Sequence, residues 1–433
     1  MMRDLDGNVD PLQLRLSTLL RCLKMTEDLF ITRTAVPASA GPRQPDTEEI
    51  LVLEEEFEAL DPRLWQHEVT MAGGGNGEFQ VYVNNRSNSW TEDGVLYIQP
   101  TLTADWIGEK KVSGEEVFEL DLWGNACTSD MSYGCCRRSD LAARRIINPI
   151  MSAQITTARS FSFTYGRVEC RAKISKGDWL YPAFWMKPAS QRYGDWPGAS
   201  SGICSLQWRR LCCYFIDLLR SIFNISSGEI DILEARGNPP NFTPGRPDAG
   251  GNDMYSSCAH WGPTLELNQF RRTFAWKRGP NWSLADEWHT YGFHWDADGM
   301  YTYLDNDDNR VLQVPFDAPA WERGNLSRFE SVNNPWRRRG NAAPFDEPFF
   351  LVLNVAVGGV GKNFVDGHGK KPWTENDTDA MAKFWEARED WLPTWNGRDT
   401  AFKVDSVRVW QRRRDIELVS PPPELLPTKL AAG

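Results

Sequence analysis

The amino-acid sequence predicts an all-β protein, an antiparallel sandwich or barrel, over most of its length. Short apolar or alternating runs recur between about residues 49 and 412, and turn signals separate them. Val168, Cys170, Ala172 and Ile174 alternate with charged side chains, which is typical of a strand buried on one face. Long apolar patterns of helical period are few. Many short strands joined by turns favour a sandwich or barrel over a helical fold.

Six segments carry the strand pattern most clearly. Within the fourth, Asp296-Ala-Asp-Gly299 separates two aromatic runs and has the composition of a hairpin turn. In chain order the segments are 81–85, 94–100, 163–174, 288–306, 349–359 and 402–411.

Three parts of the chain depart from this pattern. Residues 1–48 combine a leucine run of helical spacing with several prolines, and we expect a variable, poorly ordered segment. Residues 413–433 form a proline-containing tail. Residues 202–227 are rich in Leu, Cys and Arg, show no alternation, and lie between two Ser-Ser-Gly triplets. We interpret them as a translated intron or a recent insertion; a true helical insertion is the alternative. The remaining residues, 49–412, are expected to form one domain.

Charge and hydropathy exclude some classes of partner. The chain has 59 acidic and 48 basic residues, a net charge of −11. Such a surface repels phosphate backbones, so nucleic acid is not an expected partner. No segment is long and apolar enough to cross a membrane, and no export signal is visible near the start. We expect a monomer without a membrane partner.

Aromatic and cysteine residues give two further indications. The 20 Trp residues supply flat apolar faces on which sugars stack, although a Trp-rich core is the alternative. Nine cysteines are an odd number, and none has metal-ligand spacing, so we expect neither a metal nor a cofactor. Cys127 precedes the adjacent Cys135 and Cys136 in a polar loop. We expect a disulfide from Cys127 to one of that pair in an oxidising compartment.

The segment Gly228–Asn238 contains three closely spaced acids. On a strand Glu229 and Asp231 share a face, whereas strict alternation would turn Glu234 to the opposite side. A β-bulge at Ile232-Leu233 would return Glu234 to the face of the other two. Retaining glycosidases need such a pair of carboxyl groups, one to attack the anomeric carbon and one to protonate the leaving oxygen. A solvated acidic strand face or a cation site is the alternative.

The residues around this cluster resemble glycoside hydrolase family 16, in its laminarinase-like branch with the β-1,3-glucan recognition proteins of invertebrates. The resemblance extends over about residues 54–411, apart from 202–227. It rests on separated motifs at Asn84–Asn88, Gly166–Lys173, Gly177–Met186, Gly228–Asn238, His260–Pro263, Trp288–Trp295 and Leu353–Gly359.

The resemblance implies a concanavalin A-like jelly roll of two antiparallel sheets with an open substrate cleft. It assigns Glu229 as nucleophile, Glu234 as general acid/base and Asp231 as the assisting acid. Six further residues are expected near the sugar. Trp179 and Trp185 would lie on the cleft floor, and Trp261 would stack on a sugar. Asn84 and Arg86 would bind glucose hydroxyls, and His260 would border the reducing side.

The activity that the resemblance implies is endo-acting, retaining hydrolysis of β-1,3-glucan outside the cell. The alternative is a non-catalytic β-1,3-glucan pattern-recognition protein of innate immunity. Such proteins commonly lack one or both catalytic glutamates, whereas Glu229, Asp231 and Glu234 all stand at motif spacing here. The acid trio therefore favours the enzyme.

Overall fold

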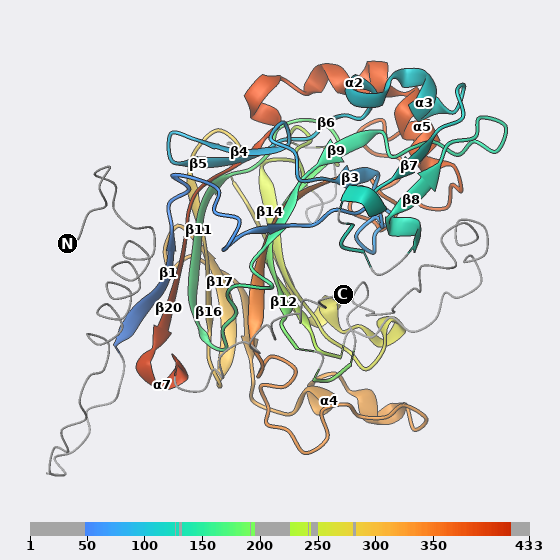
Figure 1. The fold of residues 1–433 in the computed structure, drawn as a ribbon. Coiled ribbons are helices and arrows are strands. Elements are labelled where there is room, and N and C mark those ends of the chain that lie inside the picture. The colour runs from blue at the N-terminus through green and yellow to red at the C-terminus, as the bar shows by residue number, and fades with distance from the viewer. Residues whose placement is uncertain are drawn as a thin grey trace, which may run out of the picture. The chain divides into compact units, whose positions relative to one another are not determined.

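The computed structural model describes residues 48–416, apart from 126, 130–131, 191, 195–225, 241, 244–249 and 280–282. Two large antiparallel sheets and two small sheets make up most of the regular structure (Figure 1). The predicted all-β sandwich is therefore confirmed. The segments 1–48, 202–227 and 413–433 lie mostly outside the described residues, so the domain boundaries drawn from the sequence stay predictions.

One large sheet has eight strands. In β11, Val168 and Cys170 are fully buried while the charged residues between them are partly exposed, as the alternation predicts. The predicted hairpin at 288–306 is formed by β16 and β17, and the Asp296 N–H closes its turn on the Gly299 carbonyl (2.9 Å). The order is β18 (Arg310–Pro315), β17 (Gly299–Leu304), β16 (His289–Trp295), β11 (Gly166–Lys173), β20 (Phe402–Arg412), β5 (Val95–Ile98) and β4 (Ser89–Glu92), with β1 (Glu49–Glu55) also paired to β20.

The second large sheet has seven strands and carries the acid cluster at its centre. The cluster lies on β13, between β12 and β14. The order is β15 (Phe274–Arg278), β14 (Met254–His260), β13 (Glu229–Ala235), β12 (Leu180–Pro188), β19 (Phe349–Val357), β10 (Gln154–Thr156) and β2 (Gln66–His67).

The two large sheets pack face to face around an apolar core (Figure 1). Trp295 of one sheet meets Phe349 of the other edge-on, with ring centroids 5.6 Å apart. The Thr302 hydroxyl also donates to the Ser257 hydroxyl across the interface (2.9 Å). Burial of apolar area, at about 25 cal/mol per Å², is the main force that holds the layers together. One face of each sheet is thus committed to this core.

Two small sheets and several short helices complete the described structure. Val112 of α3 and Trp385 of α5 are buried in one apolar cluster, so these two helices pack together. No helix in the described part of the chain has the length and apolar character needed to cross a bilayer. The small sheets contain β3 (Gln80–Tyr82), β9 (Ile150–Ser152) and β6 (Thr101–Leu102), and β7 (Glu119–Asp121) and β8 (Cys136–Arg138). The helices are α2 (Ala104–Ile107), α3 (Glu109–Ser113), α4 (Ala320–Arg323), α5 (Ala380–Glu386), α6 (Arg388–Trp391) and α7 (Arg413–Ile416), and the 3₁₀ turns are η1 (Trp123–Asn125), η2 (Ser132–Gly134), η5 (Leu265–Leu267), η6 (Phe270–Arg272), η7 (Leu326–Arg328), η8 (Leu392–Thr394) and η9 (Gly397–Thr400).

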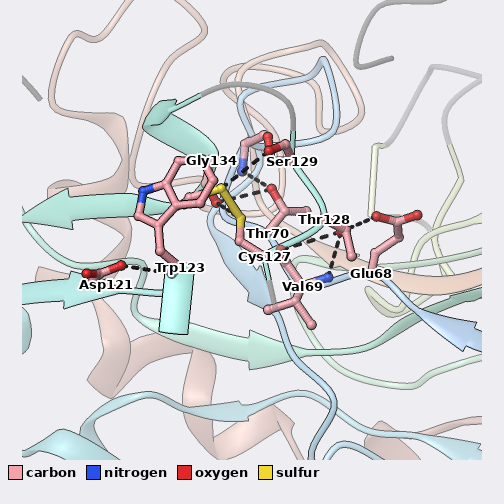
Figure 2. Close-up of a disulfide and its surroundings, with 11 residues drawn as sticks. Glu68, Val69, Thr70, Asp121, Trp123, Cys127, Thr128, Ser129 and Gly134 are labelled. Atoms are coloured by element: carbon pink, nitrogen blue, oxygen red, sulfur yellow. Dashed lines mark hydrogen bonds between the residues drawn. A yellow bond between two sulfur atoms is a disulfide. The ribbon is translucent and has the colours of Figure 1, made fainter. Parts of the chain in front are cut away.

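A disulfide joins Cys127 to Cys135 across a short loop (Figure 2). The predicted pairing of Cys127 with one of the two adjacent cysteines is confirmed, and Cys135 is the partner. Cys135 is fully buried, whereas the neighbouring Cys136 begins β8.

The disulfide loop is hydrogen-bonded to the chain that follows β2. The Thr128 hydroxyl accepts from the Val69 N–H (2.9 Å) and donates to the Glu68 carboxylate. The Gly134 carbonyl accepts from the Met71 N–H (2.8 Å) (Figure 2). The cross-linked loop therefore fixes the position of Glu68.

The two ends of the segment 195–225 lie next to each other. The Ser227 hydroxyl donates to the Gly194 carbonyl (2.9 Å), and the Tyr193 N–H donates to the same hydroxyl (3.2 Å). The Trp336 indole N–H donates to the Ser226 carbonyl (2.7 Å). The described chain is therefore hydrogen-bonded up to Gly194 on one side of this segment and from Ser226 on the other.

We expect deletion of residues 202–227 to leave the domain folded, because Gly194 and Ser227 already touch and Ser200-Ser201 would take the place of Ser226-Ser227 before Gly228. Loop length contributes only weakly to stability, so the free energy of unfolding should change by no more than about 1 kcal/mol. Urea unfolding followed by tryptophan fluorescence measures this. A deletion variant that does not unfold cooperatively would show that the segment belongs to the domain.

Loss of the disulfide should lower stability. For a loop this short, replacing Cys127 and Cys135 together by serine should reduce the free energy of unfolding by about 2–3 kcal/mol. The matched control is the wild-type protein with and without reductant, measured in the same urea series. An unchanged midpoint in both comparisons would contradict a stabilising role.

Candidate active site

A bulge in β13 brings the three acids onto one face of the seven-stranded sheet. Against β14, the register changes between Asp231 and Glu234; against β12, Leu233 pairs with Phe184 while Asp231 pairs with Trp185. Ile232 is the extra residue and is fully buried in the core. The predicted bulge at 232–233 is therefore confirmed. Glu229, Asp231 and Glu234 all face away from the inter-sheet core.

Neighbouring strands add side chains to this acid face. Glu229 pairs with His260 and Glu234 with Ser256 on β14, and Trp185 of β12 lies directly opposite Asp231. The structure thus brings together five of the predicted site residues, which are Glu229, Asp231, Glu234, Trp185 and His260.

Asp231 is held by His260. The His260 Nε2 lies 3.3 Å from the Asp231 Oδ2, and Asp231 is only 4% exposed. The Asn268 carbonyl oxygen accepts from the Phe270 N–H (3.0 Å), so its amide group faces the His260 Nδ1 (2.8 Å) and donates to it. A neutral His260 therefore carries its proton on Nε2, the nitrogen that lies 3.3 Å from the Asp231 Oδ2.

Burial dominates the titration of the three acids. It raises the pKa of Asp231 to about 8 and, together with the charge of Asp231, raises the pKa of Glu234 to about 8. The pKa of Glu229 is likewise raised, first by burial and then by repulsion from Asp231. Three carboxyl groups in one poorly solvated cluster cannot all be ionised, so they share protons at neutral pH.

Different charged side chains act on the two glutamates. Lys187, on the acid face of β12, acts on Glu229 and favours its ionised form. Glu68, fixed by the disulfide loop, in turn favours the charged form of Lys187, although burial lowers the pKa of that lysine. Glu234 instead faces Glu78, a buried acid whose pKa is raised to about 7 by burial and partly by Glu234. This repulsion favours a protonated Glu234.

Tyr181 and Arg236 complete the surroundings of Glu234. The Tyr181 hydroxyl hydrogen-bonds to the Glu234 carboxylate, and the positive charge of Arg236 also stabilises the ionised form. The Arg236 guanidinium lies 5.9 Å from the centre of the Tyr181 ring. Glu234 can therefore exist in both protonation states without losing its neighbours.

The Trp185 ring is half-buried and fixed from below. Its indole N–H donates to the Asn354 carbonyl oxygen (2.7 Å), and the Asn354 amide donates to the Tyr82 hydroxyl (2.9 Å). This chain of bonds orients one partly exposed ring beside Asp231. The orientation suits a flat apolar partner.

Two other predicted sugar contacts are wrong in this structure. Trp179 is 1% exposed and packs edge-on against the rings of Phe364 and Trp373. Trp261 is also 1% exposed, and its indole N–H donates to the Thr273 hydroxyl (3.0 Å). Both rings are buried in the inter-sheet core, in line with the Trp-rich core noted as the alternative reading of the composition.

Asn84 and Arg86 are exposed in the loop after β3. Arg86 donates to the Ser89 carbonyl (3.4 Å). Their binding to glucose hydroxyls stays a prediction.

One group of side chains on this face has the composition of a metal site. The ligand atoms of Asp231, Cys258 and His260 lie within 4.8 Å of one another. However, Asn268 keeps the proton of a neutral His260 on Nε2, the nitrogen that a metal would need. Burial also raises the pKa of Cys258 well above its usual value, which opposes the thiolate form. The group fits a hydrogen-bonded His–Asp pair better than a metal ion.

Several residues of the site were not identified from the sequence. These residues are Glu68, Glu78, Tyr181, Lys187 and Asn354. A usable signal existed for Glu78, because Glu78, Gln80 and Tyr82 alternate directly after the glycine-rich loop 73–77. The Gln80 amide donates to Glu78 (2.8 Å) and thereby holds it in place. Lys187 also alternates with Trp185 on β12.

Comparison with known proteins identifies relatives of the chain and agrees with its fold. The chain is 40% identical over 374 residues to the β-1,3-glucan-binding protein of Penaeus monodon, covering 83% of this chain and 90% of that protein. It is 30% identical over 353 residues to β-1,3-glucan-binding protein 1 of Manduca sexta, covering 81% of this chain but only 62% of that protein. No protein-family model matches the chain.

Among solved structures, one from work on endo-acting O-glycanases of the human gut microbiota has a TM-score of 0.51 and 21% identity, covering 87% of this chain and 96% of that chain. At this identity the similarity supports the fold alone. The extent of the Penaeus monodon match and the motifs around Glu229 and Glu234 together identify the protein family. The chain belongs to the β-1,3-glucan-binding protein family, in the laminarinase-like branch of glycoside hydrolase family 16.

Proposed function

We propose that this chain hydrolyses β-1,3-glucan internally and with retention of anomeric configuration. The observation that carries the proposal is the acid face of β13, where the bulge brings Glu229, Asp231 and Glu234 together. The ligand class is supported by the relatives, which are named as β-1,3-glucan-binding proteins.

The proposed reaction has two steps. Glu229 attacks the anomeric carbon while Glu234 gives its proton to the departing glycosidic oxygen, which leaves a covalent glycosyl-enzyme. Water then attacks the same carbon, Glu234 takes the proton of that water, and Glu229 departs as the free carboxylate. Each step inverts the carbon once, so the configuration is retained.

The charges around the two glutamates support these roles. A nucleophile must be ionised while the acid is protonated, so the environments must separate the two pKa values. Lys187 favours the ionised form of Glu229, and repulsion from Glu78 favours the protonated form of Glu234. Asp231, whose Oδ2 lies 3.3 Å from the His260 Nε2, is proposed as the acid that assists Glu229.

A second candidate is a glucan-recognition protein without hydrolytic activity. The names of the relatives favour it, because they record binding. Binding alone would use Trp185 and other aromatic faces, but it has no need for three acids that repel one another.

We further propose an extracellular location, because the Cys127–Cys135 disulfide suits an oxidising compartment.

Glu229→Gln should abolish release of reducing sugar from laminarin, because the amide cannot act as nucleophile. Glu234→Gln should lower kcat by a factor of about 10²–10⁴, the usual contribution of a general acid/base. The matched control is Asp286→Asn, whose exposed carboxylate pairs with Lys176 (2.9 Å).

Two outcomes would contradict the proposal. A wild-type protein that binds laminarin but releases no sugar would establish the recognition function instead. Initial products with the α configuration, seen by proton NMR, would exclude retention.

Activity should decline as the pH rises above about 8, where Glu234 loses the proton that it must donate. Glu78→Gln removes a negative neighbour of Glu234, which lowers the pKa of Glu234. The alkaline limb of the kcat/KM profile should therefore move to lower pH. A Glu78→Gln limb at or above the wild-type position would show that Glu78 does not act on Glu234.

A further inference from the structure

Two aromatic rings are exposed on β15, the edge strand next to the acid-bearing part of the sheet. Phe274 and Trp276 are 39% and 38% exposed. Ala275, between them, packs against the inter-sheet core. Because side chains alternate along a strand, both rings lie on the opposite face of the sheet, which is the acid face.

The strand register aligns these rings with the acids. Trp276 pairs with Ser256, which pairs with Glu234. Neighbouring strands lie about 4.8 Å apart, so the backbones of Trp276 and Glu234 are separated by about 10 Å. Only the short Ser256 side chain stands between them in this row.

A second row of paired residues crosses the same three strands beside the first. Phe274 pairs with Cys258, which pairs with Asp231. Cys258 is small and buried, and its thiol faces the Phe270 carbonyl (4.0 Å), so this row is covered by η6. The Ser256 row therefore forms the path from Glu234 to the aromatic pair, and Trp185 stands at the other side of Asp231.

This continuity indicates which partner the rings bind. An enzyme that cuts a polymer internally must hold sugar units beyond the cleaved bond, and the pair lies a sugar unit or two from the acids. Flat aromatic faces in partial contact with water suit the apolar faces of pyranose rings. A protein partner at the edge strand would need no alignment with Glu234 and Asp231.

We propose that Phe274 and Trp276 form a glucan-stacking subsite on β15, which binds the β-1,3-glucan chain where it leaves the acid trio. The proposal rests on the proposed function in that the acid face must bind this polymer. In this proposal the edge strand β15 provides the affinity for long glucan chains, whereas Glu229 and Glu234 carry out the chemistry.

The test measures laminarin binding in the Glu229→Gln background, by affinity electrophoresis in laminarin-containing gels and by titration calorimetry. The Phe274→Ala/Trp276→Ala double variant should bind laminarin about tenfold more weakly. Trp276→Tyr, which keeps an aromatic face, should recover most of the affinity. The control is Trp106→Ala, a more exposed tryptophan (54%) on α2 outside this sheet. Since all three rings are exposed, these variants should fold.

In the protein that keeps Glu229, the double substitution should raise the KM for laminarin about tenfold and change kcat less than twofold. Unchanged laminarin affinity of the double variant would overturn the subsite. So would a change in its oligomeric mass without a change in laminarin affinity, which would identify a protein interface. A wild-type protein that binds laminarin without cleaving it would refute the hydrolase alone, and the affinity comparison would still decide the subsite. If the wild type binds no laminarin, both proposals fail.

Discussion

The β-bulge at Ile232 is the constraint on which the site depends. With regular alternation, either Glu234 or the isoleucines Ile230 and Ile232 would face the wrong layer, and burial of an unpaired carboxylate between the sheets would cost several kcal/mol. The extra residue resolves this conflict, because both isoleucines enter the core while Glu229, Asp231 and Glu234 share the outer face. The packing of the sandwich and the chemistry of the acid face are thus satisfied by one local irregularity.

Once the acids share a face, their electrostatics follow from what the neighbouring segments bring to it. Burial raises the pKa values of Asp231 and Glu234, and repulsion from Asp231 adds to the shift of Glu234, so the cluster holds protons at neutral pH. Segments distant in sequence then make the two glutamates unequal. The disulfide loop fixes Glu68, which supports Lys187 beside Glu229, whereas the loop after residue 77 directs Glu78 toward Glu234. A structural cross-link and a glycine-rich loop therefore both bear on the protonation of the site.

The same face combines two physical tasks. The centre, on β12 to β14, is acidic and poorly solvated, which suits proton transfer and nucleophilic attack. Its borders are aromatic, with Trp185 held by Asn354 on one side and Phe274 and Trp276 exposed on the other. Binding and cleavage can thus be separated by mutation, which matters in a family whose members are named for glucan binding.

The sequence by itself determined the features that are local. Alternation predicted β11, turn composition predicted the 296–299 hairpin, and acid spacing predicted the bulge, because each depends on residues a few positions apart. Only the tertiary structure decided which aromatic rings are buried, since Trp179 and Trp261 have the same sequence character as rings that meet a ligand. It also decided the roles of Glu78, Lys187 and Trp276. Their relation to the acids arises from strand register and loop packing between distant segments.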